Sequence, residues 1–196
     1  MNKVAMKARE SGMPEEDSWA SFFEVDKAIE RLLPQDTLNG DWVEFGCGYG
    51  TFTLPASQRI TGTLKALDIE PDMIHRINQL SAEHCLNNIE AEKRDFVQFG
   101  TGLSDQTQSG AMIYNLLHLD DPVDLLREAY RTLKVGGCLS VIHWRGDIPT
   151  PRGPALEIRP SPEQCCEWIE AAGFKHIQAI DLADCCPYHF GLLAWR

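Results

Sequence analysis

Hydrophobic and polar positions along this chain follow two alternating periods from residue 42 onward. Short apolar runs, such as 42–45, 63–69 and 111–115, are separated by segments in which apolar residues recur every three or four positions. Short apolar runs are typical of buried strands, and the three-to-four spacing is typical of amphipathic helices. Repeated strand–helix units predict an α/β fold, namely a doubly wound, Rossmann-like and mostly parallel sheet with helices on both faces.

The same pattern, with the residues that begin or end helices, gives the individual elements. Seven strands are expected, at 42–45, 63–69, 88–94, 111–115, 139–144, 174–180 and 188–195. Helices are expected at 52–60, from Pro71, from Pro122 to the Gly136-Gly137 pair, and from Pro162 to Ala172. The segment 161–164 has the spacing of a capping box, and 100–109 is expected to be a loop. No helix separates the last two strands, so they are expected to be antiparallel neighbours.

The N-terminal part is predicted to be a helical cap over one edge of the sheet. From 15 to 33 the apolar residues fall largely on one helical face, and Pro34 ends the run. A break in this helix is expected near Val25-Asp26, and a loosely held N-terminus precedes it. The predicted organisation is a helical cap at 1–38 and a single α/β domain at 39–196.

The composition and charge of the chain limit the kinds of molecule that we expect it to bind. The 196 residues are 43% hydrophobic and 24% charged, with a formal net charge of −11. An acidic chain is poorly suited to a phosphate backbone or to an anionic membrane surface, so neither nucleic acid nor membrane is expected as a partner. Seven cysteines without a framework spacing favour a reducing compartment, and we expect a cytoplasmic location. No feature of the sequence points to a particular oligomeric state.

The segment from Trp42 to Thr51 carries the most informative motif. Glu44 lies near the end of a short apolar run, and glycines follow at positions 46, 48 and 50. Glycines here let a ligand lie against bare backbone. Thr51 stands where the dinucleotide fingerprint G-x-G-x-x-G has its third glycine. The departure argues against a pyrophosphate and favours a ligand with a charged amino-acid group, with NAD left as the alternative.

Four segments in a fixed order make the chain resemble the class I S-adenosylmethionine-dependent methyltransferases. They are 43–50, 66–74, 94–96 and 117–137. The resemblance is to the small type related to the ubiquinone/menaquinone methyltransferases, and with the closing helix and strands it covers about residues 40–196. It implies S-adenosylmethionine as cofactor and in-line methyl transfer to a small-molecule acceptor. Two departures are modest: Glu44 stands where Asp is usual, and Val135 where proline is usual.

The resemblance also implies a role for residues at the strand ends. Glu44 would face the methionine ammonium, Asp68 would accept both ribose hydroxyls, and Asp95 would accept the adenine amine. The implied cofactor-binding set is Glu44, Gly46, Cys47, Gly48, Gly50, Asp68, Ile69, Asp95, Phe96, Asn115 and Leu116. From the residues alone, Asp68 could also be a helix cap and Asp95 an ordinary turn residue.

Candidates for the acceptor side lie outside these motifs. Methyl transfer from a sulfonium releases a neutral leaving group, so a base is needed only if the acceptor holds a proton with a high pKa. His118 and His143 are the candidates for such a base, and ordinary structural histidines are the alternative. Candidates for substrate contact are Trp19, Phe23, Arg145, Arg152 and Arg159, against core packing for the aromatics and solvated charges for the arginines. The arginines favour an anionic acceptor.

Two further interpretations stay open at this point. The pairs Cys165-Cys166 and Cys185-Cys186 raise the question of a soft metal or metalloid, but their spacing matches no metal motif and no metal site is expected. As a class of protein, the alternatives to a methyltransferase are a non-catalytic S-adenosylmethionine-binding scaffold and an NAD-binding oxidoreductase. The motifs fit O-, N-, C- and S-methylation equally.

Overall fold

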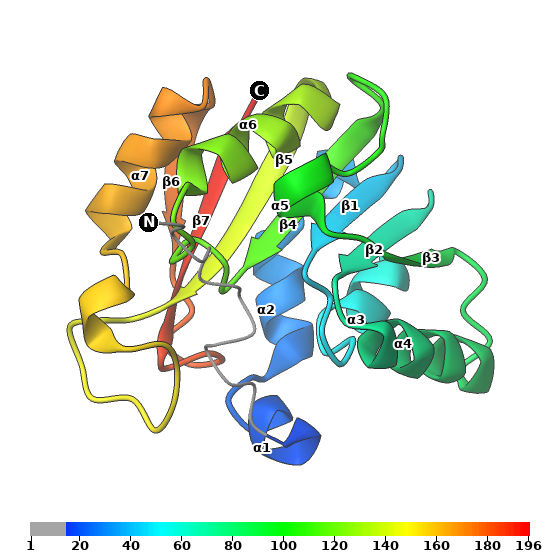
Figure 1. Cartoon of the computed structure of the whole chain (residues 1–196), viewed down its shortest axis with the longest axis horizontal. Helices are drawn as coiled ribbons and strands as arrows, with labels where there is room; N and C mark the ends of the chain where they lie inside the picture. The colour runs from blue at the N-terminus through cyan, green and yellow to red at the C-terminus, as the bar shows by residue number, and fades with distance from the viewer. Residues whose placement is uncertain (1–14) are drawn as a thin grey trace, which may run out of the picture.

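A seven-stranded sheet between two layers of helices forms the body of the protein (Figure 1). The computed structural model describes residues 15–196. The strands are β1 (Trp42–Phe45), β2 (Leu64–Asp68), β3 (Ile89–Lys93), β4 (Gln108–Tyr114), β5 (Leu133–Trp144), β6 (Lys175–Ile180) and β7 (His189–Trp195). Their order is β3-β2-β1-β4-β5-β7-β6, and β7 runs antiparallel to both β5 and β6. The predicted fold class is therefore confirmed.

The helices follow the strands in the alternation that the sequence predicts. They are α1 (Glu16–Ala20), α2 (Val25–Leu32), α3 (Thr53–Ser57), α4 (Pro71–Glu83), α5 (Phe96–Phe99), α6 (Pro122–Thr132) and α7 (Pro162–Ala171), with 3₁₀ turns η2 (Gln35–Thr37) and η3 (Leu156–Ile158). The predicted capping box begins α7, where Ser161 and Gln164 bond each other's backbone N–H groups. Because it satisfies two otherwise unpaired donors, this box fixes the start of α7.

The core lies on both faces of the sheet. On one face, side chains of α2 and α3 pack with Trp42, Met112 and Leu193, and α4 packs on β2 beside them. On the other face, α5, α6 and α7 pack with strand residues of opposite parity, such as Ile113 and Val141. Coverage of both faces explains why β1 and β4 read as continuous apolar runs instead of alternating ones.

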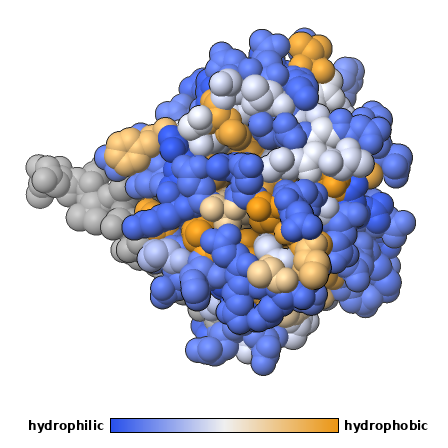
Figure 2. Space-filling model, turned by 90° about the vertical axis from the view of Figure 1, so that its right-hand side faces the viewer, coloured by the Kyte–Doolittle hydropathy of each residue, from blue (hydrophilic) through white to orange (hydrophobic). Residues whose placement is uncertain are grey.

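The edges of the sheet are less apolar than its centre. The edge strands β3 and β6 are largely solvent-accessible, and Lys65 of β2 forms an ion pair with Glu92 of β3 at 2.8 Å. The face of the molecule that carries α4 and β3 is mostly hydrophilic, with hydrophobic side chains in separate small areas (Figure 2). Charged edges discourage pairing with another sheet. Within residues 15–196, none of the helices is apolar over the length that crossing a bilayer requires.

The N-terminal helices differ from the prediction in two ways. The helix is interrupted at 21–24, between α1 and α2, slightly before the predicted break at Val25-Asp26. Furthermore, α2 covers a face of the sheet instead of an edge, because its apolar side Ala28, Ile29 and Leu32 is completely buried in the core. Residues 1–14, which the sequence predicts to be loosely held, lie outside the described residues. The division of the chain at residue 38 stays a prediction.

The region around Gly136-Gly137 also differs from the prediction. The helix before it ends at Thr132, and β5 begins at Leu133, six residues before the predicted start. The glycine pair belongs to the strand, where Gly136 donates to Arg196 O and Arg196 donates to Gly137 O, both at 3.0 Å. The glycine pair therefore bonds Arg196 within the sheet and does not itself end the helix, which already stops at Thr132.

Replacing Ile29 tests whether α2 is part of the cooperative core. Ile29→Ala should lower the free energy of unfolding by about 2–4 kcal/mol, because a fully buried aliphatic side chain leaves a cavity. Urea unfolding followed by circular dichroism measures it, with exposed Glu30→Ala on the same helix as control. An unchanged transition midpoint for Ile29→Ala would mean that α2 is an independent appendage.

Candidate functional site

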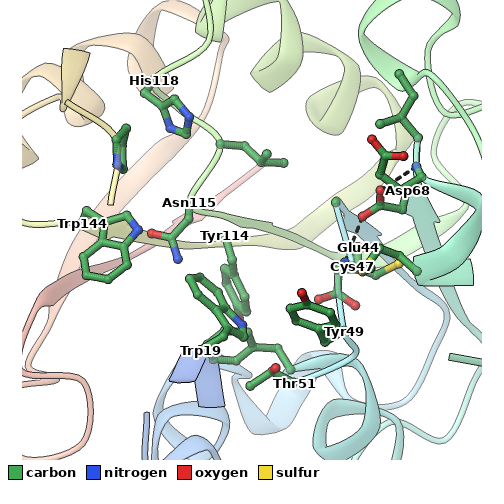
Figure 3. A pocket seen from close by; sticks show the side chains of 18 of the residues that line it. Trp19, Glu44, Cys47, Tyr49, Thr51, Asp68, Tyr114, Asn115, His118 and Trp144 are labelled. Atoms are coloured by element: carbon green, nitrogen blue, oxygen red, sulfur yellow. Dashed lines mark hydrogen bonds between the residues drawn. The ribbon is translucent and has the colours of Figure 1, made fainter. Parts of the chain in front are cut away.

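A cavity of about 310 Å³ opens at the carboxyl ends of β1, β2 and β4 (Figure 3). It lies where the strand order reverses direction, between β1 and β4, which is where doubly wound sheets hold ligands. Glu44 and Asp68 lie on one side of this space, and Asn115, His118 and Trp144 lie on the other. The strand ends therefore bring together residues that are far apart in the sequence.

A glycine turn after β1 forms the floor of the cavity. Gly46, Gly48 and Gly50 all have positive φ, at 72°, 52° and 85°, a backbone conformation that other residues rarely adopt. The N–H groups of Gly46 and Cys47 both donate to Leu67 O, which ties the turn to β2. Gly46, Cys47 and Gly48 line the cavity. Gly50 does not, and a Cβ there would overlap Leu54.

Asp68 holds the glycine turn in place from the end of β2. Its Oδ2 accepts the N–H of Gly48 and its Oδ1 accepts the N–H of Glu70, each at 2.9 Å. Burial raises the pKa of this carboxyl, and the two backbone N–H groups oppose the shift. A carboxylate offers about four lone-pair sites, so both oxygens keep capacity for ligand hydroxyls.

Glu44 is a buried carboxyl group in the wall of the cavity. Its side chain is only 2% exposed, and its Oε2 accepts a hydrogen bond from Thr53 Oγ1 at 2.6 Å. Burial raises its pKa from 4.5 to about 8, and the charge of Asp68 adds to this while the Thr53 hydroxyl opposes it. A cation placed beside it would favour the ionised form. The position therefore suits a ligand ammonium.

The part of the cavity beyond Asp68 is mostly apolar. Ile69, Met73 and Phe96 line it, and the predicted contact of Ile69 and Phe96 with the adenine stays a prediction. Asp95 does not line it, because its carboxylate caps α5 by accepting the N–H of Gln98 at 3.0 Å. The helix-cap contact is what the structure shows for Asp95, and its adenine contact stays a prediction.

Asn115 and Leu116 follow β4 on the opposite wall. Asn115 has a φ of 59°, which is uncommon for a residue with a side chain, and Leu116 lies where a Cβ at Gly46 would touch it. The amide oxygen and nitrogen of Asn115 are both buried and have no hydrogen-bond partner among residues 15–196. Buried amides are nearly always satisfied, so this pair of atoms is available to a ligand.

His118 and His143 contact each other, which the sequence does not reveal. His118 Nδ1 lies 3.3 Å from His143 Nε2, and His118 lines the cavity while His143 is buried behind it in β5. Burial lowers the pKa of His118 to about 4 and that of His143 to about 3. Both rings are therefore neutral near pH 7.

Aromatic side chains form part of the cavity wall. Trp19 and Trp144 line it with ring centroids 6.3 Å apart, and Phe52 and Tyr114 line it at 4.8 Å. Phe23 does not line the cavity, because it packs between Trp19 and Phe52 in the core. Sequence reasoning missed several lining residues: Tyr49, Thr51, Phe52, Glu70, Met73, Tyr114, Trp144, Gly153 and Pro154. Their position in the glycine turn or at strand ends was the available signal for most of them.

The three arginines of the segment after β5 have different surroundings. Only Arg152 lines the cavity. Arg145 forms an exposed ion pair with Asp147 at 2.6 Å. Arg159 donates to the carbonyls of Pro154, Arg145 and Arg152 and to the hydroxyl of Thr150, so it holds the segment together. Arg152 is therefore the candidate for contact with an anionic acceptor.

The seven cysteines are all unpaired. Cys185 and Cys186 are buried, and burial raises the pKa of both thiols, so neither favours the thiolate that a soft metal needs. Within the described part of the chain, no group of three or more His, Cys, Asp or Glu side chains is arranged to hold a metal ion.

Comparison with known proteins shows which proteins the chain resembles. Residues 43–137 match the family model of a methyltransferase domain. The chain is 29% identical over 140 residues to 2-methyl-6-phytyl-1,4-hydroquinone methyltransferase 1, chloroplastic, from Oryza sativa subsp. japonica. That alignment covers 69% of this chain, and the chain spans 41% of the length of that relative.

Solved structures agree on the fold. An S-adenosylmethionine-dependent methyltransferase from Aquifex aeolicus superposes with a TM-score of 0.75 and 22% identity, covering 91% of this chain and 93% of the other. The [4+2]-cyclase SpnF superposes with a TM-score of 0.68 and 16% identity, covering 86% and 78%. The matched family model, the rice relative and the Aquifex structure are all described as methyltransferases, so the chain is similar to this class in sequence and in fold, as the sequence motifs predict. The cofactor of this class is S-adenosylmethionine.

The residues of the cavity fit that cofactor. The glycine turn leaves room for a ligand, because a Cβ at Gly46 would contact Leu116 at 3.1 Å. Glu44 and Asp68 supply acceptors for an ammonium and for hydroxyls. The unpartnered amide of Asn115 faces them across the space. The N–H groups of Gly48 and Glu70 already donate to Asp68, so they are not available to a pyrophosphate. The cavity therefore suits a sulfonium nucleoside that has no pyrophosphate.

The stability of the empty protein should depend on the ionisation of Glu44. Between pH 4.5 and about 8 the folded state keeps a proton on Glu44 that the unfolded state has lost. The free energy of unfolding should therefore fall as the pH rises through this window, by up to about 1.4 kcal/mol per pH unit. Urea unfolding of the wild type and of Glu44→Gln from pH 5 to 9 measures it, since only the variant lacks the contribution. Exposed Glu30→Gln is the control, and identical pH profiles for the wild type and Glu44→Gln would contradict the shift.

Proposed function

We propose that the protein transfers a methyl group from S-adenosylmethionine to a small planar acceptor in this cavity. The observation that carries the proposal is the juxtaposition of two buried carboxyl groups, Glu44 and Asp68, with the unpartnered polar atoms of Asn115 and His118 on the opposite wall. One wall suits the cofactor, and the other offers hydrogen bonds to a second molecule. A cavity with both is what in-line transfer between two bound molecules requires.

The cofactor side would use the glycine turn and the ends of β1 and β2. Glu44 would face the methionine ammonium, and the methionine part would lie on the backbone of Gly46 and Gly48. Asp68 would accept the ribose hydroxyls, and the apolar end near Ile69 and Phe96 would receive the adenine. Bound in this way, S-adenosylmethionine supplies an electrophilic methyl group on a sulfonium. The role of the protein is then to orient the acceptor and exclude water.

The acceptor side favours a flat molecule with a negative or ionisable group. Trp19, Tyr114 and Trp144 offer aromatic surfaces, and Arg152 offers a guanidinium at the same cavity. The rice relative is named for a hydroquinone, which supports a phenolic acceptor for this chain as well. The seven unpaired cysteines support action in the cytoplasm.

A second candidate function rests on one neighbour. The [4+2]-cyclase SpnF has the same fold, so a protein of this architecture need not transfer a methyl group. Intact carboxyl groups at Glu44 and Asp68 favour turnover with the cofactor over a scaffold that merely keeps the fold. An NAD-binding oxidoreductase is disfavoured, because Thr51 replaces the third glycine of the dinucleotide fingerprint.

Cofactor binding tests the assignment of Asp68 against that of Asp95. In titration calorimetry with S-adenosylmethionine, Asp68→Asn should raise the Kd by about 10- to 100-fold, because an amide cannot serve two N–H groups and the ribose hydroxyls together. Asp95→Ser keeps a good helix cap but is too short to reach a ligand, so it should leave the Kd within about twofold. Loss of affinity in Asp95→Ser would instead support the adenine role that the resemblance implies. Wild-type protein that binds NAD and ignores S-adenosylmethionine would overturn the proposed function.

Acceptor preference tests Arg152. With 1,4-hydroquinone and 2,5-dihydroxybenzoate as probes, Arg152→Ala should raise the KM for the carboxylate about tenfold and leave that for hydroquinone nearly unchanged. Arg145→Ala is the matched control, since its ion pair with Asp147 is exposed and outside the cavity. An equal rise for both probes would show that Arg152 shapes the segment without binding an anion.

A further inference from the structure

His118 and His143 form a continuous pair from the cavity wall into the core of the sheet. His118 follows β4 and lines the cavity, and His143 belongs to β5, directly before Trp144. The contact joins His118 Nδ1 to His143 Nε2 at 3.3 Å. His143 Nδ1 in turn lies 3.2 Å from Trp144 O. The cavity is thus connected to a fixed backbone carbonyl through two imidazole rings.

The carbonyl of Trp144 determines which ring nitrogens carry protons. A carbonyl oxygen only accepts, so His143 Nδ1 must hold a proton. A neutral imidazole has one N–H, so His143 Nε2 is an acceptor and His118 Nδ1 must donate to it. His118 Nε2 is therefore left with a free lone pair.

Both rings are neutral near pH 7, as this assignment requires. Burial lowers the pKa of both histidines, and Arg159 adds to the effect on each. The other titratable groups nearby are His189 on β7, which is also buried with a lowered pKa, and Arg152 at the cavity. Glu44, Asp68 and Glu70 are the carboxyl groups that line the cavity, with Glu44 and Asp68 on the facing wall. No carboxyl group appears among the contributors to the pKa of either histidine.

The free lone pair of His118 is buried and unused. Among residues 15–196, Nε2 has no hydrogen-bond partner, and the nearby amide of Asn115 is in the same condition. Leaving a buried polar group unsatisfied costs about 1–3 kcal/mol. Polar atoms without partners at the end of one strand, in the wall of one cavity, indicate a ligand that donates a hydrogen bond to Nε2.

We propose, on the basis of the proposed function, that His118 Nε2 takes the proton of an acceptor hydroxyl during methyl transfer. His143 acts as a positioning residue that holds His118 in the required tautomer, and Asn115 orients the same hydroxyl-bearing acceptor. The established motifs of the class concern the cofactor, so this pair adds a role on the acceptor side.

The step balances in atoms and charge. The acceptor O–H bond breaks and its proton moves to His118 Nε2. The electron pair left on oxygen forms the bond to the methyl carbon, and the pair of the carbon–sulfur bond stays on sulfur as a neutral thioether. One positive charge disappears at sulfur as another forms on His118, so the net charge of the cavity is unchanged. A weakly basic histidine serves here because the neighbouring cation is lost in the same step.

The tautomers are tested by nitrogen NMR of the full chain with ¹⁵N-labelled histidine and bound S-adenosylhomocysteine. Both rings are expected in the Nδ1–H form, which is the less common tautomer of free histidine. Signals are assigned by their loss in His118→Gln and His143→Gln. His143→Leu should return His118 to the Nε2–H form, because its acceptor is gone. A proton on His118 Nε2 in the wild type would overturn the proposal, whatever the acceptor is.

Kinetics with 1,4-hydroquinone test the proton transfer itself. The kcat of the wild type should be flat from pH 6 to 9, because Nε2 stays unprotonated throughout. His118→Gln should lower kcat at pH 7 by about 100-fold or more and leave the Kd for S-adenosylmethionine unchanged. The kcat of His118→Gln should then rise about tenfold per pH unit as the acceptor hydroxyl ionises in solution. His143→Leu should lower kcat by less than His118→Gln does. His143→Gln should keep more of the wild-type kcat than His143→Leu, because the glutamine side-chain oxygen accepts from His118.

Controls separate this proposal from the proposed function. His84→Gln changes an exposed histidine outside the cavity and should behave as the wild type. If His118→Gln keeps the wild-type kcat and pH profile while methyl transfer proceeds, the base is wrong and the function stands. A methyl group found on a ring carbon would also overturn the oxygen step. If the wild type binds S-adenosylmethionine but methylates neither phenol probe, the acceptor class fails and the proton transfer fails with it.

Discussion

The site depends on the carboxylate of Asp68, which accepts one backbone N–H from the glycine turn and one from the start of the next segment. The bond from Gly48 joins the turn after β1 to the end of β2 and holds Gly48 in its left-handed conformation, whereas the bond from Glu70 is local to the end of β2. The bond from Gly48 exists only because β1 and β2 are parallel neighbours, with Phe45 in register with Leu67. The shape of the cavity floor is therefore a direct result of the sheet topology.

The cavity has two walls with different chemistry. The wall made by β1 and β2 carries acidic groups and bare backbone, whereas the wall made by β4, β5 and the following segment carries aromatic rings, an amide and the neutral imidazole of His118. Burial acts oppositely on the two kinds of titratable group, raising the pKa of Glu44 and lowering that of His118. In both cases burial favours the neutral form.

Much of the fold was predictable because local signals agreed with the tertiary structure. The apolar run 42–45, Pro71 and Pro122 at helix starts and the capping box at Ser161 all gave correct elements. The start of β5 was wrong, because a strand that pairs with the chain's last residue leaves no local signal before Gly136. The placement of α2 was also wrong, because its amphipathic pattern shows that one side is buried without showing against which surface.

The candidate site was predictable in part for a similar reason. Residues within one motif, such as Gly46 and Gly48, lie together at the cavity because their local spacing brings them there. The contact between His118 and His143 joins positions 25 residues apart, and the different surroundings of Arg152 and Arg159 depend on how one loop folds on itself. Sequence spacing alone treats those arginines as equivalent.

The segment from Arg145 to Arg159 is held mainly by hydrogen bonds within itself. This has a consequence for how the sequence of such a protein changes in evolution. Arg159 ties this segment mainly to its own carbonyls and to the hydroxyl of Thr150, so this part of the cavity wall keeps its form largely without help from the glycine turn. Under the proposed function, exchange of this stretch between relatives would alter selectivity for the acceptor and leave the residues proposed to bind the cofactor intact. The glycine turn and the segment after β5 can thus change independently of each other.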